Sequence, residues 1–316
     1  MGRIKEKVYW KVEEQDENMD KGGRRASKEN IVAWTFNLPT LVILLGIVFV
    51  PIIQAAYMST LFYNLKLPQM TRFIGLDNYI SLILDPLFWF SLRVTATFTI
   101  ISVLIVTGVG LIFALLLSQE FKGRGILRAL LLIPWAVTGV MAGILWRWMY
   151  NPEYGFINIL LNSIGIKIGS YSWLNESSTA LLSVAIAYAW SSTPIATILY
   201  LGALQSLPID LYDSAKVDGA GSWQRFYLIT FPLLKPTTMI ILIITTMFAL
   251  KEIGLVYVMT GGGPGNETTV LGWLIYSEAF KFLDFGRGAA VSFILAAITI
   301  VIATFYIKSL YKEVEF

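Results

Sequence analysis

Six long apolar segments set the limits on what this chain can fold into. Each has about twenty or more residues with few charges, and they span residues 38–62, 90–118, 125–149, 180–201, 237–258 and 288–307. A helix needs roughly 20 apolar residues to cross a hydrocarbon core about 30 Å thick. Only 14% of the residues are charged, against about a quarter in soluble domains. The sequence therefore predicts an all-α, polytopic membrane protein with six transmembrane helices in residues 34–310, between tails at 1–33 and 311–316.

The placement of lysine and arginine predicts the orientation of these helices. Sixteen of them fall in the N-terminal tail, in the loops after the second and fourth segments and at the C-terminus, whereas five fall in the other loops. Positively charged residues collect on the cytoplasmic side of a membrane. We therefore expect both termini to be cytoplasmic. The first 30 residues lack an apolar core, so no cleavable signal peptide is expected.

The composition excludes several kinds of chemistry. The chain has no cysteine and no histidine, which removes disulfides, thiol catalysis and the usual zinc sites, and we expect no metal. Its net charge of +3 is too small to favour nucleic acid. The glycine-rich stretch 261–265 lacks the Gly-Lys-Ser/Thr ending of a phosphate-binding loop. We therefore expect neither a nucleotide nor another cofactor in this chain.

The predicted cytoplasmic loop between the fourth and fifth segments carries its own helix start and stop signals. Ser206 and Pro208 are typical of a helix start, and the stretch 219–221, Gly-Ala-Gly, is typical of a helix end. Ser222 is expected to cap a second short helix that ends near Pro232. These signals predict an exposed helix–turn–helix. An amphipathic connector at the membrane surface fits the same periodicity.

The residues of this loop resemble those of a known family. Asp213-Ser214-Ala215, followed by Gly219 and then by Ile-Thr-Phe-Pro at 229–232, is similar to the EAA loop of ABC importer permeases. Asp213 stands where the family usually has Glu, and Ser214 stands where it has the first Ala.

The same loop and two further stretches carry a finer resemblance. Residues 215–220 and 229–236 are similar to the carbohydrate-uptake branch, as are 73–79, Phe-Ile-Gly-Leu-Asp-Asn-Tyr, and 259–264, Met-Thr-Gly-Gly-Gly-Pro. The glycine run resembles that of the first permease in maltose-type and glycerol-phosphate-type systems. The resemblance covers residues 35–310.

This resemblance implies a fold, a function and a set of partners. The fold is that of an ABC type I importer permease in a bacterial or archaeal plasma membrane, and residues 202–236 form its coupling loop. The partners are a second homologous permease, two ATPase subunits that bind ATP and magnesium, an extracytoplasmic solute-binding protein and membrane lipid. The chain itself is then not an enzyme, and its cargo is a sugar or oligosaccharide. The residues expected to contact the ATPase are Asp213, Ser214, Ala215, Asp218 and Gly219.

The resemblance also implies that the fourth and fifth helices line the solute path, and helical spacing gives candidates on each. Tyr188 and Ser192 are four residues apart and share a face. The candidates on the fifth helix are Thr245, Phe248, Lys251 and Glu252, of which Thr245, Phe248 and Glu252 share a face. A carboxylate inside a membrane is costly and is usually functional. An ion pair of Glu252 with Lys251, or with the partner permease, is the alternative.

Two other functions compete with this interpretation. A secondary transporter or channel not coupled to an ATPase would use the loop as a gate rather than as a docking element. An intramembrane enzyme fits less well, because no pairing of a nucleophile with a base is visible.

Overall fold

The computed structural model describes the backbone of residues 34–314 and the side chains of residues 34–309. The chain divides into two compact units, residues 1–57 and 58–316, each described here by itself. The first unit contributes an apolar helical run that begins at Trp34 and includes the π-helical stretch η1 (Leu44–Phe49) and α2 (Val50–Ser59). Ile47 is 71% exposed, so this helix needs lipid or another protein around it. The predicted N-terminal tail, 1–33, lies outside the described residues.

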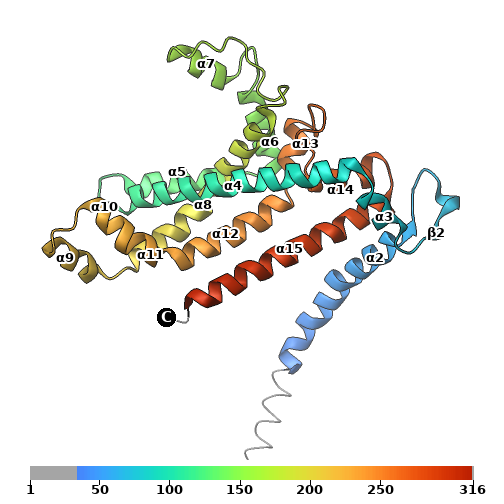
Figure 1. Ribbon diagram of the computed structural model, residues 1–316, viewed down its shortest axis with the longest axis horizontal. Coiled ribbons are helices and arrows are strands. Elements are labelled where there is room, and N and C mark those ends of the chain that lie inside the picture. The colour runs from blue at the N-terminus through green and yellow to red at the C-terminus, as the bar shows by residue number, and fades with distance from the viewer. Residues whose placement is uncertain (1–33, 315–316) are drawn as a thin grey trace, which may run out of the picture. The chain divides into compact units, whose positions relative to one another are not determined.

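Four long helices form the body of the second unit (Figure 1): α4 (Pro86–Ser118), α8 (Ala180–Gln205), α12 (Lys235–Leu250) and α15 (Phe285–Val314). The helices α4 and α8 pack closely against each other. At Gly110 of α4, an added Cβ atom would lie only 2.7 Å from the Cβ atom of Ala196. Phe98 and Val106 of α4 and Tyr200 of α8 are fully buried in this core. Small residues at the crossing let the two backbones approach, as is usual between membrane helices.

Shorter elements connect the long helices. Towards the N-terminus these are β1 (Leu61–Phe62), η2 (Pro68–Met70), β2 (Arg72–Phe73), α3 (Asp77–Ile83), α5 (Arg124–Ala136), α6 (Gly139–Met149) and α7 (Phe156–Ser163). Towards the C-terminus they are α9 (Ile209–Val217), α10 (Ser222–Arg225), η3 (Phe226–Thr230), α11 (Phe231–Leu233), α13 (Gly254–Met259), α14 (Leu271–Tyr276) and η4 (Ser277–Lys281). The antiparallel pair β1–β2 aligns Leu61 with Phe73 and Phe62 with Arg72.

The helices match the predicted apolar segments, with two corrections. In the described residues, four helices are long and apolar enough to cross a membrane, and six spans result if each of two bent pairs counts as one. The predicted span 125–149 is not one straight helix, because α5 and α6 meet at 101°. The break falls at Val137 and Thr138, whose extended backbone angles end α5 before α6 begins. The second bent pair is Ser222–Leu233 with Lys235–Leu250, which meet at 62°. The predicted span 237–258 is also interrupted, between the end of α12 at Leu250 and the start of α13 at Gly254.

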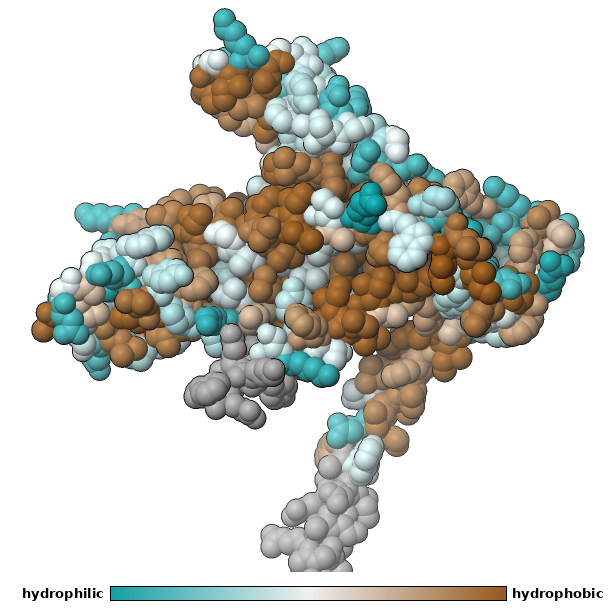
Figure 2. All heavy atoms as spheres, viewed as in Figure 1, coloured by the Kyte–Doolittle hydropathy of each residue, from teal (hydrophilic) through white to brown (hydrophobic). Residues whose placement is uncertain are grey.

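The surface of the second unit agrees with a membrane location. Figure 2 shows hydrophobic side chains over the long helices, whereas hydrophilic ones gather around α9 and α10 and near the loops at the opposite end. A hydrophobic band with polar ends is the pattern expected of a protein whose middle faces lipid.

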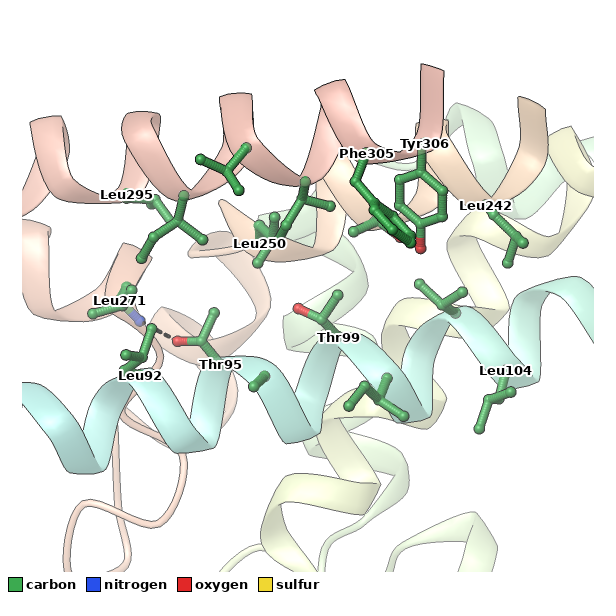
Figure 3. Close-up of a pocket in the computed structure, with 17 residues that line it drawn as sticks. Leu92, Thr95, Thr99, Leu104, Leu242, Leu250, Leu271, Leu295, Phe305 and Tyr306 are labelled. Carbon is green, nitrogen blue, oxygen red and sulfur yellow. Dashed lines mark hydrogen bonds between the residues drawn. The ribbon is translucent and has the colours of Figure 1, made fainter. Parts of the chain in front are cut away.

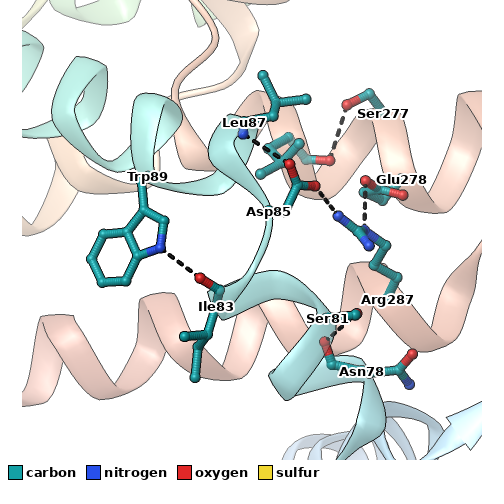
Figure 4. Close-up of polar contacts among 10 residues, drawn as sticks. Asn78, Ser81, Ile83, Asp85, Leu87, Trp89, Ser277, Glu278 and Arg287 are labelled. Atoms are coloured by element: carbon teal, nitrogen blue, oxygen red, sulfur yellow. Dashed lines mark hydrogen bonds and ion pairs between the residues drawn. The ribbon is translucent and has the colours of Figure 1, made fainter.

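An ion network joins three elements at the end of the bundle opposite α9 (Figure 4). Arg287, in the first turn of α15, pairs with Asp85 at the start of α4, and its Nε donates to Oε1 of Glu278 in η4 over 3.0 Å. Burial raises the pKa of the Glu278 carboxyl, and the adjacent guanidinium opposes that rise. The network ties the starts of α4 and α15 together.

Candidate functional site

A polar cavity of about 230 Å³ lies where α8, α12 and the two helix breaks meet. Its lining residues are Trp135, Val137, Gly139, Tyr188, Ser191, Ser192, Ile195, Ile244, Thr245, Phe248, Glu252 and Leu255. Five of the six residues predicted for the solute path are among them: Tyr188, Ser192, Thr245, Phe248 and Glu252. The structure therefore brings both predicted helical faces to one cavity.

Tyr188 holds a fixed position in the wall of this cavity. Its hydroxyl donates to the backbone carbonyl of Thr245 over 3.3 Å, which links α8 to α12. Its ring meets Phe98 of α4 edge to face, with the ring centroids 5.5 Å apart. Contacts on both sides leave the side chain only 4% exposed. Tyr188 thus presents a rigid aromatic and polar surface.

Glu252 occupies the break between α12 and α13. Its Oε1 accepts a hydrogen bond from the backbone N–H of Leu255 over 2.9 Å. Backbone N–H groups in the first turn of a helix have no partner inside the helix, so a side chain that accepts from them caps it. The carboxylate therefore stabilises the break in the fifth span as well as lining the cavity.

Glycines let the two broken spans pack tightly beside the cavity. At Gly254, an added Cβ atom would lie 3.5 Å from backbone atoms of Gly139 and Val140, at the start of α6. At Gly272 of α14, an added Cβ atom would lie 2.5 Å from the carbonyl oxygen of Glu252. A larger side chain at Gly272 would displace the backbone that carries the cavity wall, whereas an added Cβ atom at Gly254 makes only ordinary contacts.

Lys251 is the one predicted path residue that does not line the cavity. Its ammonium lies over the ring of Phe248, 4.9 Å from the ring centroid, which is a cation–π contact. Within the side chains that the structure describes, Lys251 and Glu252 do not form an ion pair. The intramolecular form of the ion-pair alternative is therefore absent from this conformation.

Sequence reasoning missed the contribution of the third span. Trp135, Val137 and Gly139 come from the break between α5 and α6. The available signal was Pro134 inside an apolar run, which indicates a break but not what the freed segment faces. Ser191 was also missed, although it precedes a predicted residue.

A larger cavity, of about 670 Å³, lies between α4, α12 and α15 and has a different character (Figure 3). Its lining is almost entirely aliphatic, with a few hydroxyl groups. Three of these are already engaged, since Oγ1 of Thr95 accepts from the backbone N–H of Leu271 and the hydroxyls of Thr246 and Tyr306 lie 3.3 Å apart. Such a groove suits hydrocarbon rather than a hydroxyl-rich solute.

The predicted coupling loop forms a separate, exposed structure at the end of the bundle where α8 and α12 are connected. None of the side chains of α9 is buried, and Val217 at its end is 88% exposed. Asp213 and Lys216 form a surface ion pair of 2.7 Å. The hydroxyls of Tyr212 and Thr230 lie 2.9 Å apart, which connects α9 to the following helical run.

The turn after α9 depends on glycine, and the structure corrects two predicted helix caps near it. Gly219 has φ of +78°, a left-handed conformation that only glycine adopts readily. Ser206 ends α8 instead of starting the next helix. Ser222 is the first helical residue of α10 rather than its cap, because Gly221 precedes the helix and its N–H donates to Oε1 of Gln224 over 2.9 Å.

Comparisons with known proteins identify the family. Residues 29–312 match the model of the binding-protein-dependent transport system inner membrane component. The chain is 37% identical over 281 residues to the trehalose/maltose transport system permease protein MalF of Thermococcus litoralis, covering 89% of this chain and 94% of that protein. It is 34% identical to the sulfoquinovosyl glycerol transport system permease protein SmoG of Agrobacterium fabrum, covering 89% and 90%.

A solved structure shares the fold. A chain of a bacterial ABC transporter involved in the import of the acidic polysaccharide alginate matches with a TM-score of 0.76 and 24% identity, covering 90% of this chain and 96% of that one. Together with the family match over residues 29–312, this likeness identifies the chain as a member of the binding-protein-dependent transport system inner membrane component family, the permeases of ABC importers.

Proposed function

We propose that this chain is a permease subunit of an ATP-driven importer that translocates a sugar or oligosaccharide delivered by an extracytoplasmic binding protein. One observation carries the proposal: the two long helices that line the polar cavity, α8 and α12, are those that the exposed loop connects. A force on that loop therefore reaches both cavity walls directly. The names of the trehalose/maltose and sulfoquinovosyl glycerol relatives support a saccharide as cargo.

The cavity has the chemistry that a saccharide needs. The hydroxyls of Ser191 and Ser192 can donate hydrogen bonds to sugar hydroxyls and accept hydrogen bonds from them, and the carboxylate of Glu252 can accept them. Trp135 and Phe248 supply apolar ring faces against which a sugar ring can pack. These two kinds of contact are the ones that a polyol with apolar ring faces requires.

The proposed mechanism is alternating access driven from the loop. Two ATPase subunits bind ATP and magnesium, so this chain needs no cofactor and catalyses no hydrolysis. When they close, they move α9 and the turn at Gly219. The ends of α8 and α12 follow, and the cavity changes the side to which it opens. A second homologous permease supplies the other half of the path.

The test is ATP-dependent uptake by the full complex in lipid vesicles. We expect uptake of a labelled neutral oligosaccharide to require ATP and the binding protein. Glu252→Gln should lower uptake about tenfold, because a hydrogen bond to a charged acceptor contributes about 1.5–3 kcal/mol. A sizing column shows whether the variant complex stays assembled. Uptake driven by an ion gradient without ATPase subunits would instead favour a secondary transporter.

The absence of cysteine makes the proposed cytoplasmic placement of both termini easy to test. A single cysteine at Glu176, an exposed residue between α7 and α8, should react with an impermeant thiol reagent added to intact cells. One at the exposed Ser222 should react only after the membrane is permeabilised. The reverse pattern would invert the proposed topology.

A further inference from the structure

The formally charged side chains in the cavity lining carry charge of one sign. Among the cavity-lining residues, all of which lie in the described part of the chain, Glu252 is the only one with a formally charged side chain. The others are aromatic, aliphatic or hydroxyl-bearing, and no arginine or lysine is present to receive an anion. Recognition of carboxylate, sulfonate or phosphate groups in proteins usually depends on arginine or lysine.

The nearest cation in sequence does not neutralise this charge. Lys251 is exposed, and its ammonium is held on the ring of Phe248 rather than against the carboxylate. The backbone N–H groups of the helix break are the partners of the Glu252 carboxylate. They hold it in place, and because backbone amides carry no net charge, they add no positive charge to the cavity wall.

The hydrogen-bonding groups of the cavity point to the same ligand class. A carboxylate accepts about four hydrogen bonds, and backbone groups use only part of this capacity. Ser191, Ser192 and Tyr188 add hydroxyl groups on the facing helix. A solute that donates several hydroxyl hydrogens fits this arrangement, whereas a solute that brings a second negative charge is repelled.

We infer that the cavity selects neutral, hydroxyl-bearing saccharides against anionic ones, and that Glu252 is the residue that sets this preference. The inference rests on the proposed function, because it assigns a substrate class to the same cavity. Selection here acts in addition to any selection by the binding protein. Like charges placed close together in a site are a common means of rejecting the wrong ligand.

The experiment measures binding to the purified transporter complex without its binding protein. The probes are maltose and the disaccharide in which one CH₂OH group of maltose is oxidised to a carboxylate. Saturation-transfer NMR detects the weak contacts of each sugar with the complex in lipid nanodiscs. For the wild type, we expect the anionic sugar to bind at least tenfold more weakly than maltose. For Glu252→Gln, we expect the difference in affinity between maltose and the anionic sugar to fall below threefold.

Glu176→Gln is the matched control, because it removes a carboxylate from an exposed loop position outside the cavity lining. In this control, the ratio of the affinities for maltose and for the anionic sugar should equal that of the wild type. Equal binding of both sugars to the wild type, or an unchanged ratio in Glu252→Gln, would overturn the inference and leave the proposed function standing. If neither sugar binds and the complex fails to import neutral oligosaccharide, the proposed function itself fails.

Discussion

Replacing Gly219 with valine should abolish transport, with uptake at least a hundredfold below wild type, while the permease remains in the membrane. The backbone at Gly219 has φ of +78°, where a β-branched residue is strongly disfavoured. No atom lies within 4 Å of the position that its Cβ atom would take. The effect therefore comes from backbone strain rather than from a clash, and it changes the direction in which α9 is presented.

Two other substitutions make this prediction specific. Gly221→Val, two residues later, should retain near-normal uptake, because Gly221 has φ of −67° and an added Cβ atom would make only an ordinary contact with Gln224. Gly219→Asn should recover part of the activity, since asparagine tolerates the left-handed region. Uptake and substrate-stimulated ATP hydrolysis are the measurements. Normal uptake by Gly219→Val would contradict the assignment of this loop as the coupling element.

Gly272→Ala should both destabilise the permease and disable it. Its added methyl group would lie 2.5 Å from the carbonyl oxygen of Glu252 and 3.4 Å from that of Lys251. Both are backbone atoms that cannot rotate away. Overpacking of this kind destabilises the fold by about 1–3 kcal/mol. If about 2 kcal/mol of that strain weakens solute binding in the cavity, uptake falls roughly thirtyfold. We expect a lower melting temperature in detergent together with that loss.

Gly202→Ala provides the opposite result for the same chemical change. Gly202 lies in α8, and no atom is within 4 Å of its added Cβ position. Alanine is favoured over glycine inside a helix by about 1 kcal/mol, so this variant should melt at a higher temperature and transport normally. A Gly272→Ala protein as stable and active as Gly202→Ala would show that the break at Glu252 does not need its tight packing.

The parts of the site that were predictable are those governed by local helical geometry. Tyr188 with Ser192, and Thr245 with Phe248 and Glu252, came together because residues three, four or seven apart share one face of a helix. The long-range fact that these two faces meet came from the family resemblance. The residue type also predicted the turn at Gly219, since glycine readily adopts the positive φ found there.

The parts that escaped prediction depend on contacts between distant segments. Hydropathy cannot separate a straight span from one bent by 101°, so the contribution of Trp135 and Gly139 was missed. Lys251 lies over the ring of Phe248 and outside the cavity lining, and helical spacing does not determine that side-chain conformation. Ser206 and Ser222 were misassigned because serine is common both at caps and in neighbouring positions, and hydrogen bonding alone decides between them.

The ion network at Arg287 has a mechanical consequence. It fastens the start of α15 to the start of α4, at the end opposite the exposed loop. From Arg287 to Ser309, α15 extends over about 33 Å at 1.5 Å per residue. A tilt of roughly 5° about the fastened end would move the other end by about 3 Å. A fastening of this kind would act as a pivot, so that a small movement of the far end of α15 separates helix ends there without parting those held by Arg287.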